Sequence, residues 1–143
     1  MEAGEYQKAL DEYDVRYRKH PRGRTVTTEY AKTVEEMRSA ADKACDEQEF
    51  AAAGRTYDLL LKRYDRFKDF AHLLTFNRAY LNQKVSLCKK SLSVLGFQEY
   101  RKGNLSEAIA MWRGFLMIDP NNEDIKKAMN TATEQQKNLQ RKK

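Results

Sequence analysis

The sequence is poor in the residues that interrupt and cross-link chains. It has only six glycines and two prolines, too few for the many tight turns of a β-sandwich or β-barrel. Its two cysteines, Cys45 and Cys88, form no CxxC pair and no zinc-ligand spacing, so we expect buried free thiols, no metal site and no cofactor. There is no long apolar run and no basic start leading into one, so the sequence predicts no membrane span and shows no signal peptide.

What the chain does contain favours helices. Hydrophobic residues make up 41% and charged residues 34% of its 143 positions, and Ala, Leu, Lys, Glu, Arg and Gln are plentiful. Eight tyrosines, six phenylalanines and one tryptophan supply the apolar mass that disordered chains lack. The composition therefore predicts a single all-α domain over residues 1–143.

One window reads as a complete helical hairpin. From Leu92 the chain reads LSVLGFQEYRKGNLSEAIAMWRGFLMIDPNN. Gly96 and Ala108 are small where two antiparallel helices would touch, and Gly103 can adopt the positive φ that ends a helix. Pro120 stops the second helix. The window therefore predicts two antiparallel helices joined by a turn at Gly103, and a second turn is expected near Gln48.

This window resembles a tetratricopeptide repeat, a helix-turn-helix unit of about 34 residues with the pattern W-x2-L-G-x2-Y, A-x3-F and P. Leu92 replaces the Trp, and Tyr100 stands one position after the expected aromatic. Weaker copies centre on Ala9 and Ala53. The resemblance implies an α-α superhelix of helical hairpins. Its parts are the second helix of a truncated repeat (4–21), a degenerate repeat (34–65), an insertion or extended helix (66–88), a well-formed repeat (89–122) and a capping helix (123–143).

The sequence segments A-I-A-x-W and I-D-P-N-N are similar to segments of repeats in bacterial envelope lipoproteins and assembly factors. A periplasmic or envelope-associated location is therefore open, with a targeting segment upstream of the sequence given. A cytoplasmic location is equally compatible with two unpaired cysteines.

Apolar spacing between His72 and Lys102 predicts one helix of about 28 to 30 residues. This helix has a second apolar row and so needs neighbours on two faces. We expect its N-terminal half, residues 74–87, to be covered by Phe67 and Phe70 folding back or by a second chain. The fold-back is favoured because an attached neighbour costs no entropy of association. The second row consists of Phe76, Tyr80, Leu87, Val94 and Phe97.

No sequence motif indicates catalysis. The chain lacks G-x-S-x-G, a phosphate loop and H-E-x-x-H, so we predict that it is not an enzyme. Tetratricopeptide arrays bind peptides or helices along the first helix of each repeat, and the resemblance therefore implies a protein-binding scaffold. Burial of Phe97 and Tyr100 in the core is an open alternative. The candidate groove residues are Lys90, Ser93, Phe97, Tyr100, Arg101, Arg38 and Asp42.

Positive charge is concentrated in the middle of the chain. Residues 66–103 contain eight basic and two acidic residues, an excess that equals the formal net charge of +6 for the whole chain. Aromatic residues alternate with these cations, a composition that also suits nucleic acid or an anionic membrane surface. Self-association, for example as a homodimer, is a further alternative. The candidate basic patch comprises Arg66, Lys68, Arg78, Lys84 and Lys89.

Overall fold

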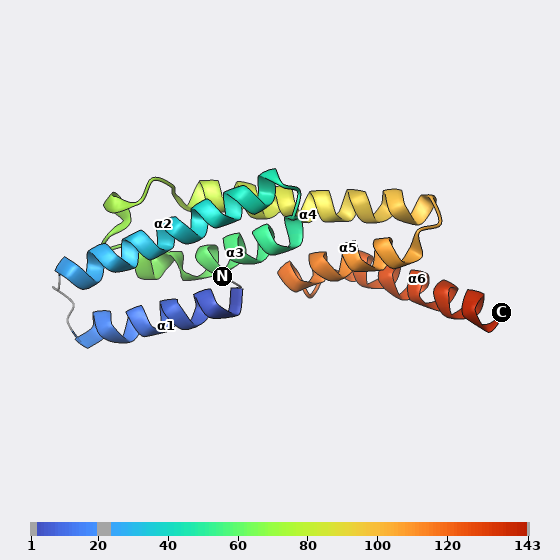
Figure 1. Cartoon of the computed structure of the whole chain (residues 1–143), viewed down its shortest axis with the longest axis horizontal. Coiled ribbons are helices and arrows are strands. Elements are labelled where there is room, and N and C mark those ends of the chain that lie inside the picture. Colours follow the sequence, from blue (N-terminus) through green and yellow to red (C-terminus); the bar gives the residue numbers. More distant parts are fainter. Residues whose placement is uncertain (1–2, 20–23, 143) are drawn as a thin grey trace.

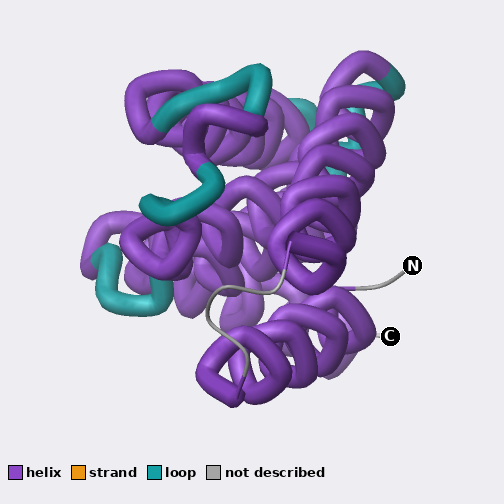
Figure 2. Tube along the Cα trace, turned by 90° about the vertical axis from the view of Figure 1, so that its left-hand side faces the viewer, coloured by secondary structure: helices purple, strands orange, loops and turns teal. Residues whose placement is uncertain are grey.

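The computed structural model describes residues 3–19 and 24–142, and these are almost entirely helical (Figure 1). Seen end on, the described residues form helices and loops without strands (Figure 2). The all-α prediction is confirmed. The six α-helices of the described part are α1 (Ala3–Lys19), α2 (Arg24–Asp46), α3 (Phe50–Arg63), α4 (Arg78–Arg101), α5 (Leu105–Ile118) and α6 (Glu123–Arg141).

Helix α4 lies in the middle of the molecule and extends toward both of its ends (Figure 1). It runs along the long axis and packs against α3 and α5, with α1 and α2 on the α3 side and α6 on the α5 side (Figure 1). The closest packing is between helices that follow one another in sequence, from α2 with α3 to α5 with α6, and α3 also contacts α5. Helix α1 packs against α2 and α3. The fold is therefore six packed helices with mainly sequential contacts.

Both predicted turns are present, and each joins two packed helices. Gln48, between α2 and α3, has φ 64°, and Gly103, between α4 and α5, has φ 85°. The left-handed conformation ends each helix, and the next helix then runs back along it. Pro120 follows the end of α5 at Ile118, as expected.

Small residues allow close approach in the middle of the molecule. A Cβ at Gly96 would lie 2.3 Å from Nε1 of Trp112, so α4 and α5 can pack at this distance only without a side chain there. A Cβ at Gly54 would lie 2.3 Å from Cδ1 of Ile118, where α3 meets α5. The prediction of a close helix contact at Gly96 is confirmed.

The predicted long helix is wrong over its first residues. Two 3-10 turns, Tyr64–Phe67 and Ala71–Leu73, precede α4, and Leu74 is extended with ψ 144°. Asn77 then caps α4, because its Oδ1 accepts a hydrogen bond from the backbone N–H of Tyr80 at 2.9 Å. Helix α4 therefore has 24 residues, about 36 Å at 1.5 Å per residue.

The chain itself covers the start of the second apolar row. Phe76 is buried, with its ring centroid 6.5 Å from that of Tyr64 and 6.3 Å from that of Tyr80. Tyr80 in turn lies 6.4 Å from Tyr57 of α3. In-chain cover is thus present at Phe76 and Tyr80, with different neighbours than predicted, whereas Leu87 at the end of the predicted range is exposed.

The rings of Phe67 and Phe70, which were predicted to provide this cover, are fully buried elsewhere. Their centroids lie 5.6 and 4.8 Å from that of Tyr30 on α2. They therefore anchor the segment between α3 and α4 to α2. Pro21, assigned to the truncated repeat, lies outside the described residues.

Candidate protein-binding surface

One face of α4 is uncovered from Leu87, near the middle of the helix, through its C-terminal half. Leu87 and Val94 are each 44% exposed and Phe97 is 37% exposed. In Figure 1 this half of α4 runs along the upper edge, with α5 and α6 below it. Polar and basic residues of α4 that are also exposed complete a single line along the helix. We call this line the α4 stripe: Gln83, Leu87, Lys90, Val94, Phe97 and Arg101.

Two predicted groove residues rest on a buried tryptophan. The ring centroid of Phe97 lies 5.0 Å from that of Trp112 in an edge-on arrangement, and that of Tyr100 lies 5.9 Å away. Trp112 is 1% exposed and belongs to the core. Each ring therefore packs inward on Trp112, while Phe97 is otherwise exposed and Tyr100 is half-buried.

A largely apolar hollow of about 450 Å³ adjoins the end of α4. Tyr100 lines it, so the hollow continues from the aromatic pair on Trp112. This hollow could not be predicted from the sequence, because its walls come from α4, α5 and α6. Exposed Leu139, on an amphipathic helix, was the one signal. The lining of this C-terminal hollow is Tyr100, Gly103, Leu105, Gln135, Asn138, Leu139 and Lys142.

The α4 stripe is basic and contains no acid. Lys90 and Arg101 are exposed, and within the described part of the chain neither forms an ion pair. The only acid of α4, Glu99, accepts a hydrogen bond from Asn104 at 2.7 Å and pairs with Lys102 at 3.4 Å. The Asn104 hydrogen bond is the main reason that the pKa of Glu99 is lowered. Ser93, another candidate, is half-buried on the same helix.

Arg38 and Asp42 lie in a network that joins three helices. The Arg38 guanidinium donates to Asp42 Oδ2 at 2.7 Å and to Glu35 Oε2 at 2.8 Å. Asp42 Oδ1 accepts hydrogen bonds from Tyr80 Oη of α4 at 2.6 Å and from Tyr57 Oη of α3. The network therefore fixes α2 against its neighbours.

The charges of this network stabilise one another. Burial alone would raise the pKa of Asp42, but hydrogen bonds from Tyr57, Tyr80 and Arg38 outweigh it and lower that pKa. Burial and the hydrogen bond to Asp42 raise the pKa of Tyr80 to about 12. Asp42 thus stays ionised and Tyr80 stays a neutral donor at neutral pH.

The two groups of predicted groove residues do not form one site. Tyr80, the α4 partner of Asp42, precedes Lys90 by ten residues, about 15 Å along the helix. Arg38 and Asp42 form ion pairs and hydrogen bonds with internal partners, whereas Lys90 and Arg101 are exposed. The α4 group and the α2 group therefore have different roles.

Most of the candidate basic patch is paired within the chain. Three of its five members pair with carboxylates and a fourth lies over an aromatic ring, whereas Lys68 lines a polar hollow that also contains Asp65 and Asp69. Charge that is neutralised internally contributes little to binding a polyanion. The contacts are Arg66 with Asp14 at 2.6 Å, Lys89 with Asp119 at 2.9 Å, Arg78 with Asp65, and Lys84 5.5 Å from the centre of the Tyr80 ring.

The two cysteines are buried free thiols, as predicted. Burial, together with the neighbouring Cys45 thiol, raises the pKa of Cys88 to about 12 and keeps it protonated. Among the described residues, no group of three or more His, Cys, Asp or Glu side chains is placed to hold a metal ion. Over those same residues, no helix combines the length and apolar character needed to cross a bilayer.

Comparisons of this chain with known protein families, curated proteins and solved structures found no match. Residues 3–19 and 24–142 form a small all-α domain in which six helices pack together.

Proposed function

We propose that this chain is a non-catalytic protein-interaction module built from tetratricopeptide-like helical hairpins. Its binding surface is the α4 stripe together with the C-terminal hollow. The pairs α2 with α3 and α4 with α5 are the two hairpins, and α6 is the terminal cap. This assignment is supported by the hairpin geometry and by the sequence pattern around Gly96 and Trp112.

The observation that carries the proposal is the exposure of Leu87, Val94 and Phe97 on one line of a long helix. Apolar side chains gathered on one exposed face, with polar and basic residues between them, are typical of a binding surface. Phe97 is held by Trp112, so it loses little side-chain freedom on binding. The adjoining hollow can receive an apolar side chain of a partner.

The titratable side chains of the described part support binding rather than catalysis. Arg38 and Asp42 stabilise one another and their neighbours. Internal pairing of the basic patch likewise favours a protein partner over nucleic acid. These contacts therefore favour protein binding through α4 over catalysis and over nucleic-acid binding.

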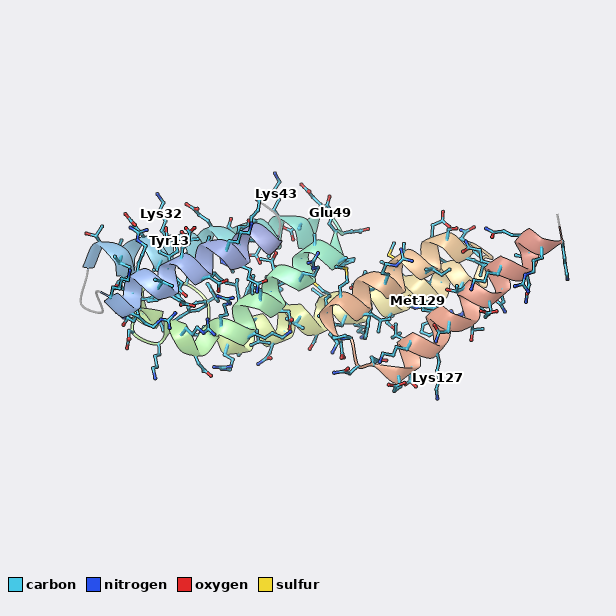
Figure 3. The ribbon with its side chains drawn as sticks, turned by 90° about the horizontal axis from the view of Figure 1, so that it is seen from below. Tyr13, Lys32, Lys43, Glu49, Lys127 and Met129 are labelled. Atoms are coloured by element: carbon cyan, nitrogen blue, oxygen red, sulfur yellow. The ribbon has the colours of Figure 1, made fainter. Side chains whose placement is uncertain are left out.

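The test is site-specific photo-crosslinking in cells of the source organism. A photoreactive phenylalanine analogue at position 94 should give a protein adduct of defined mass. The same analogue at position 127, where an exposed lysine of α6 points away from the molecule (Figure 3), should give none. Absence of an adduct at position 94, or equal adducts at both positions, would overturn the proposal.

A second variant checks that the adduct depends on the stripe. With the photoreactive residue at exposed Gln98, beside the stripe, the adduct should disappear when Leu87→Ser and Val94→Ser are introduced together. Both changes are at exposed positions, so the melting temperature should stay close to that of the parent. Loss of the adduct with unchanged melting assigns binding to the stripe, whereas persistence of the adduct contradicts it.

A further inference from the structure

The spacing of the α4 stripe matches that of a helix-helix seam. Successive stripe positions, from Gln83 to Arg101, are separated by four, three, four, three and four residues. A period of 3.5 residues keeps side chains directed at one neighbouring helix along its whole length. The stripe spans 19 residues, about 27 Å from first to last at 1.5 Å per residue.

A helical partner also fits the backbone of α4 better than an extended peptide does. The N–H and C=O groups inside α4 are bonded within the helix, so they offer nothing to an added strand. Leu87, Val94 and Phe97 can instead fit between side chains of a second helix. The stripe therefore favours partner side chains at helical spacing.

The charge of α4 selects the sign of the partner. The stripe contains two cations without ion pairs, Lys90 and Arg101, and the one acid of α4 is engaged by Asn104 and Lys102. A second copy placed stripe to stripe would bring only cations together, which opposes pairing. An acidic helix would give both cations a partner.

Resting on the proposed function, we infer that the α4 stripe binds an amphipathic helix of another protein, with acidic side chains beside its apolar row. Leu87, Val94 and Phe97 contribute the apolar contact. Lys90 and Arg101 select acidic over basic helices. The specificity is therefore electrostatic, and it should weaken with salt because both cations are exposed.

The test uses the full chain and three synthetic helices of about 21 residues, or three heptads. The acidic probe has Leu at a and d and Glu at e and g, where like charges oppose its own dimerisation. The basic probe has Lys at e and g. The third probe is a scrambled version of the acidic one. Binding is measured by titration while the backbone amide signals of residues 83–101 are followed by NMR.

The acidic probe should bind saturably, shift the signals of the stripe and bind about tenfold more tightly than the basic probe, as two exposed ion pairs allow. Lys90→Glu combined with Arg101→Glu should reverse that preference. The matched control is Lys32→Glu with Lys127→Glu, because both lysines are exposed and project from opposite edges of the molecule (Figure 3). The control should leave the preference unchanged.

Four outcomes would overturn the inference. They are equal binding of the acidic and basic probes, equal binding of the scrambled probe, binding that does not shift residues 83–101, and a wild-type dimer that Val94→Glu dissociates in sedimentation. Failure of all probes while the crosslink at position 94 persists would overturn the helical, acidic partner and leave the proposed function standing. Failure of both would remove the proposed function as well.

Discussion

One apolar row begins at Phe76, just before α4, and continues along the helix, and its two halves differ in what covers them. At the start, Phe76 and Tyr80 pack against Tyr64 and Tyr57. Farther along, Leu87 and Val94 are 44% exposed. The first half of the row is therefore part of the fold, whereas the second half is available to a partner.

Polar groups account for the difference between the halves. Tyr80 donates a hydrogen bond to Asp42, which also binds Arg38. Packing of the first half therefore buries apolar surface and also supplies a hydrogen-bond donor to a charged group. Leu87 and Val94 offer no such group to a neighbour within the chain. The apolar spacing of α4 thus predicts that a neighbour covers the row. The hydrogen bonds of Tyr80 identify the half in which that neighbour belongs to the same chain.

The largest expected effect tests the two halves directly. Phe76→Ala should lower the free energy of unfolding by about 3 kcal/mol, because a buried ring is removed from an aromatic cluster. Val94→Ala should change it by only about 0.5 kcal/mol, as for other exposed positions. Urea denaturation followed by circular dichroism measures both. Equal losses would show that the second half is also buried and would remove the comparison.

A somewhat smaller loss is expected from filling the contact between α4 and α5. Gly96→Val should destabilise by about 2 kcal/mol, since its Cβ would overlap the Trp112 indole, which would have to move. Gly4→Ala is the control, because nothing lies within 4 Å of a Cβ there. Thermal melts of the two variants should therefore diverge, and similar melting would place Trp112 away from Gly96.

The sequence predicted the regular features of both halves, because they depend on local chemistry. Gly103 and the small Gly96 identified the second hairpin, and apolar spacing identified the two-faced character of α4. It missed the start of α4, because the apolar period continues through residues 74–77. The helix starts only after Asn77, whose side chain caps α4 within that apolar period.

The candidate site was only partly predictable. Phe97, Tyr100 and Arg101 could be placed together from their positions on one helix, but the sequence left open whether the two rings are buried, and Tyr100 is in fact half-buried. The separation of Arg38 and Asp42 from them could not, because the partners of Asp42 come from α3 and α4. Helical periodicity gives the face of a residue, but it does not identify which distant tyrosines meet that face.

The network of the first half should make the protein sensitive to acid. The pKa values of Glu35 and Asp42 are lowered below 4.5 and 3.8 in the folded chain, with hydrogen bonds outweighing burial. Their stabilising contribution is therefore complete above those unfolded values and is lost as the pH falls through the folded ones. Urea titrations between pH 7 and pH 3 should show a falling free energy of unfolding.

A variant separates this effect from general acid denaturation. Asp42→Asn should lower the free energy of unfolding by about 1.5 kcal/mol at pH 7, the lower end of the range for a hydrogen bond to a charged group. Its free energy of unfolding should also depend less steeply on pH in acid than that of wild type. Asp46→Asn, on the exposed side of α2, is the matched control and should keep the wild-type slope. Identical slopes for all three proteins would exclude Asp42 as a source of acid sensitivity.

The smallest expected effect distinguishes the two turns. Gln48 and Gly103 share the left-handed conformation, but only glycine adopts it without a Cβ penalty. Gln48→Gly should therefore raise the free energy of unfolding by about 0.5 kcal/mol. This gain is the backbone strain relieved in the folded state less the extra conformational entropy of glycine in the unfolded state. Gly103→Ala should lower the free energy of unfolding by about 1 kcal/mol, because it adds a Cβ to a residue in the left-handed conformation. Gln48→Ala, which keeps the Cβ, should give no gain, and a gain equal to that of glycine would assign the effect to the lost Gln side chain.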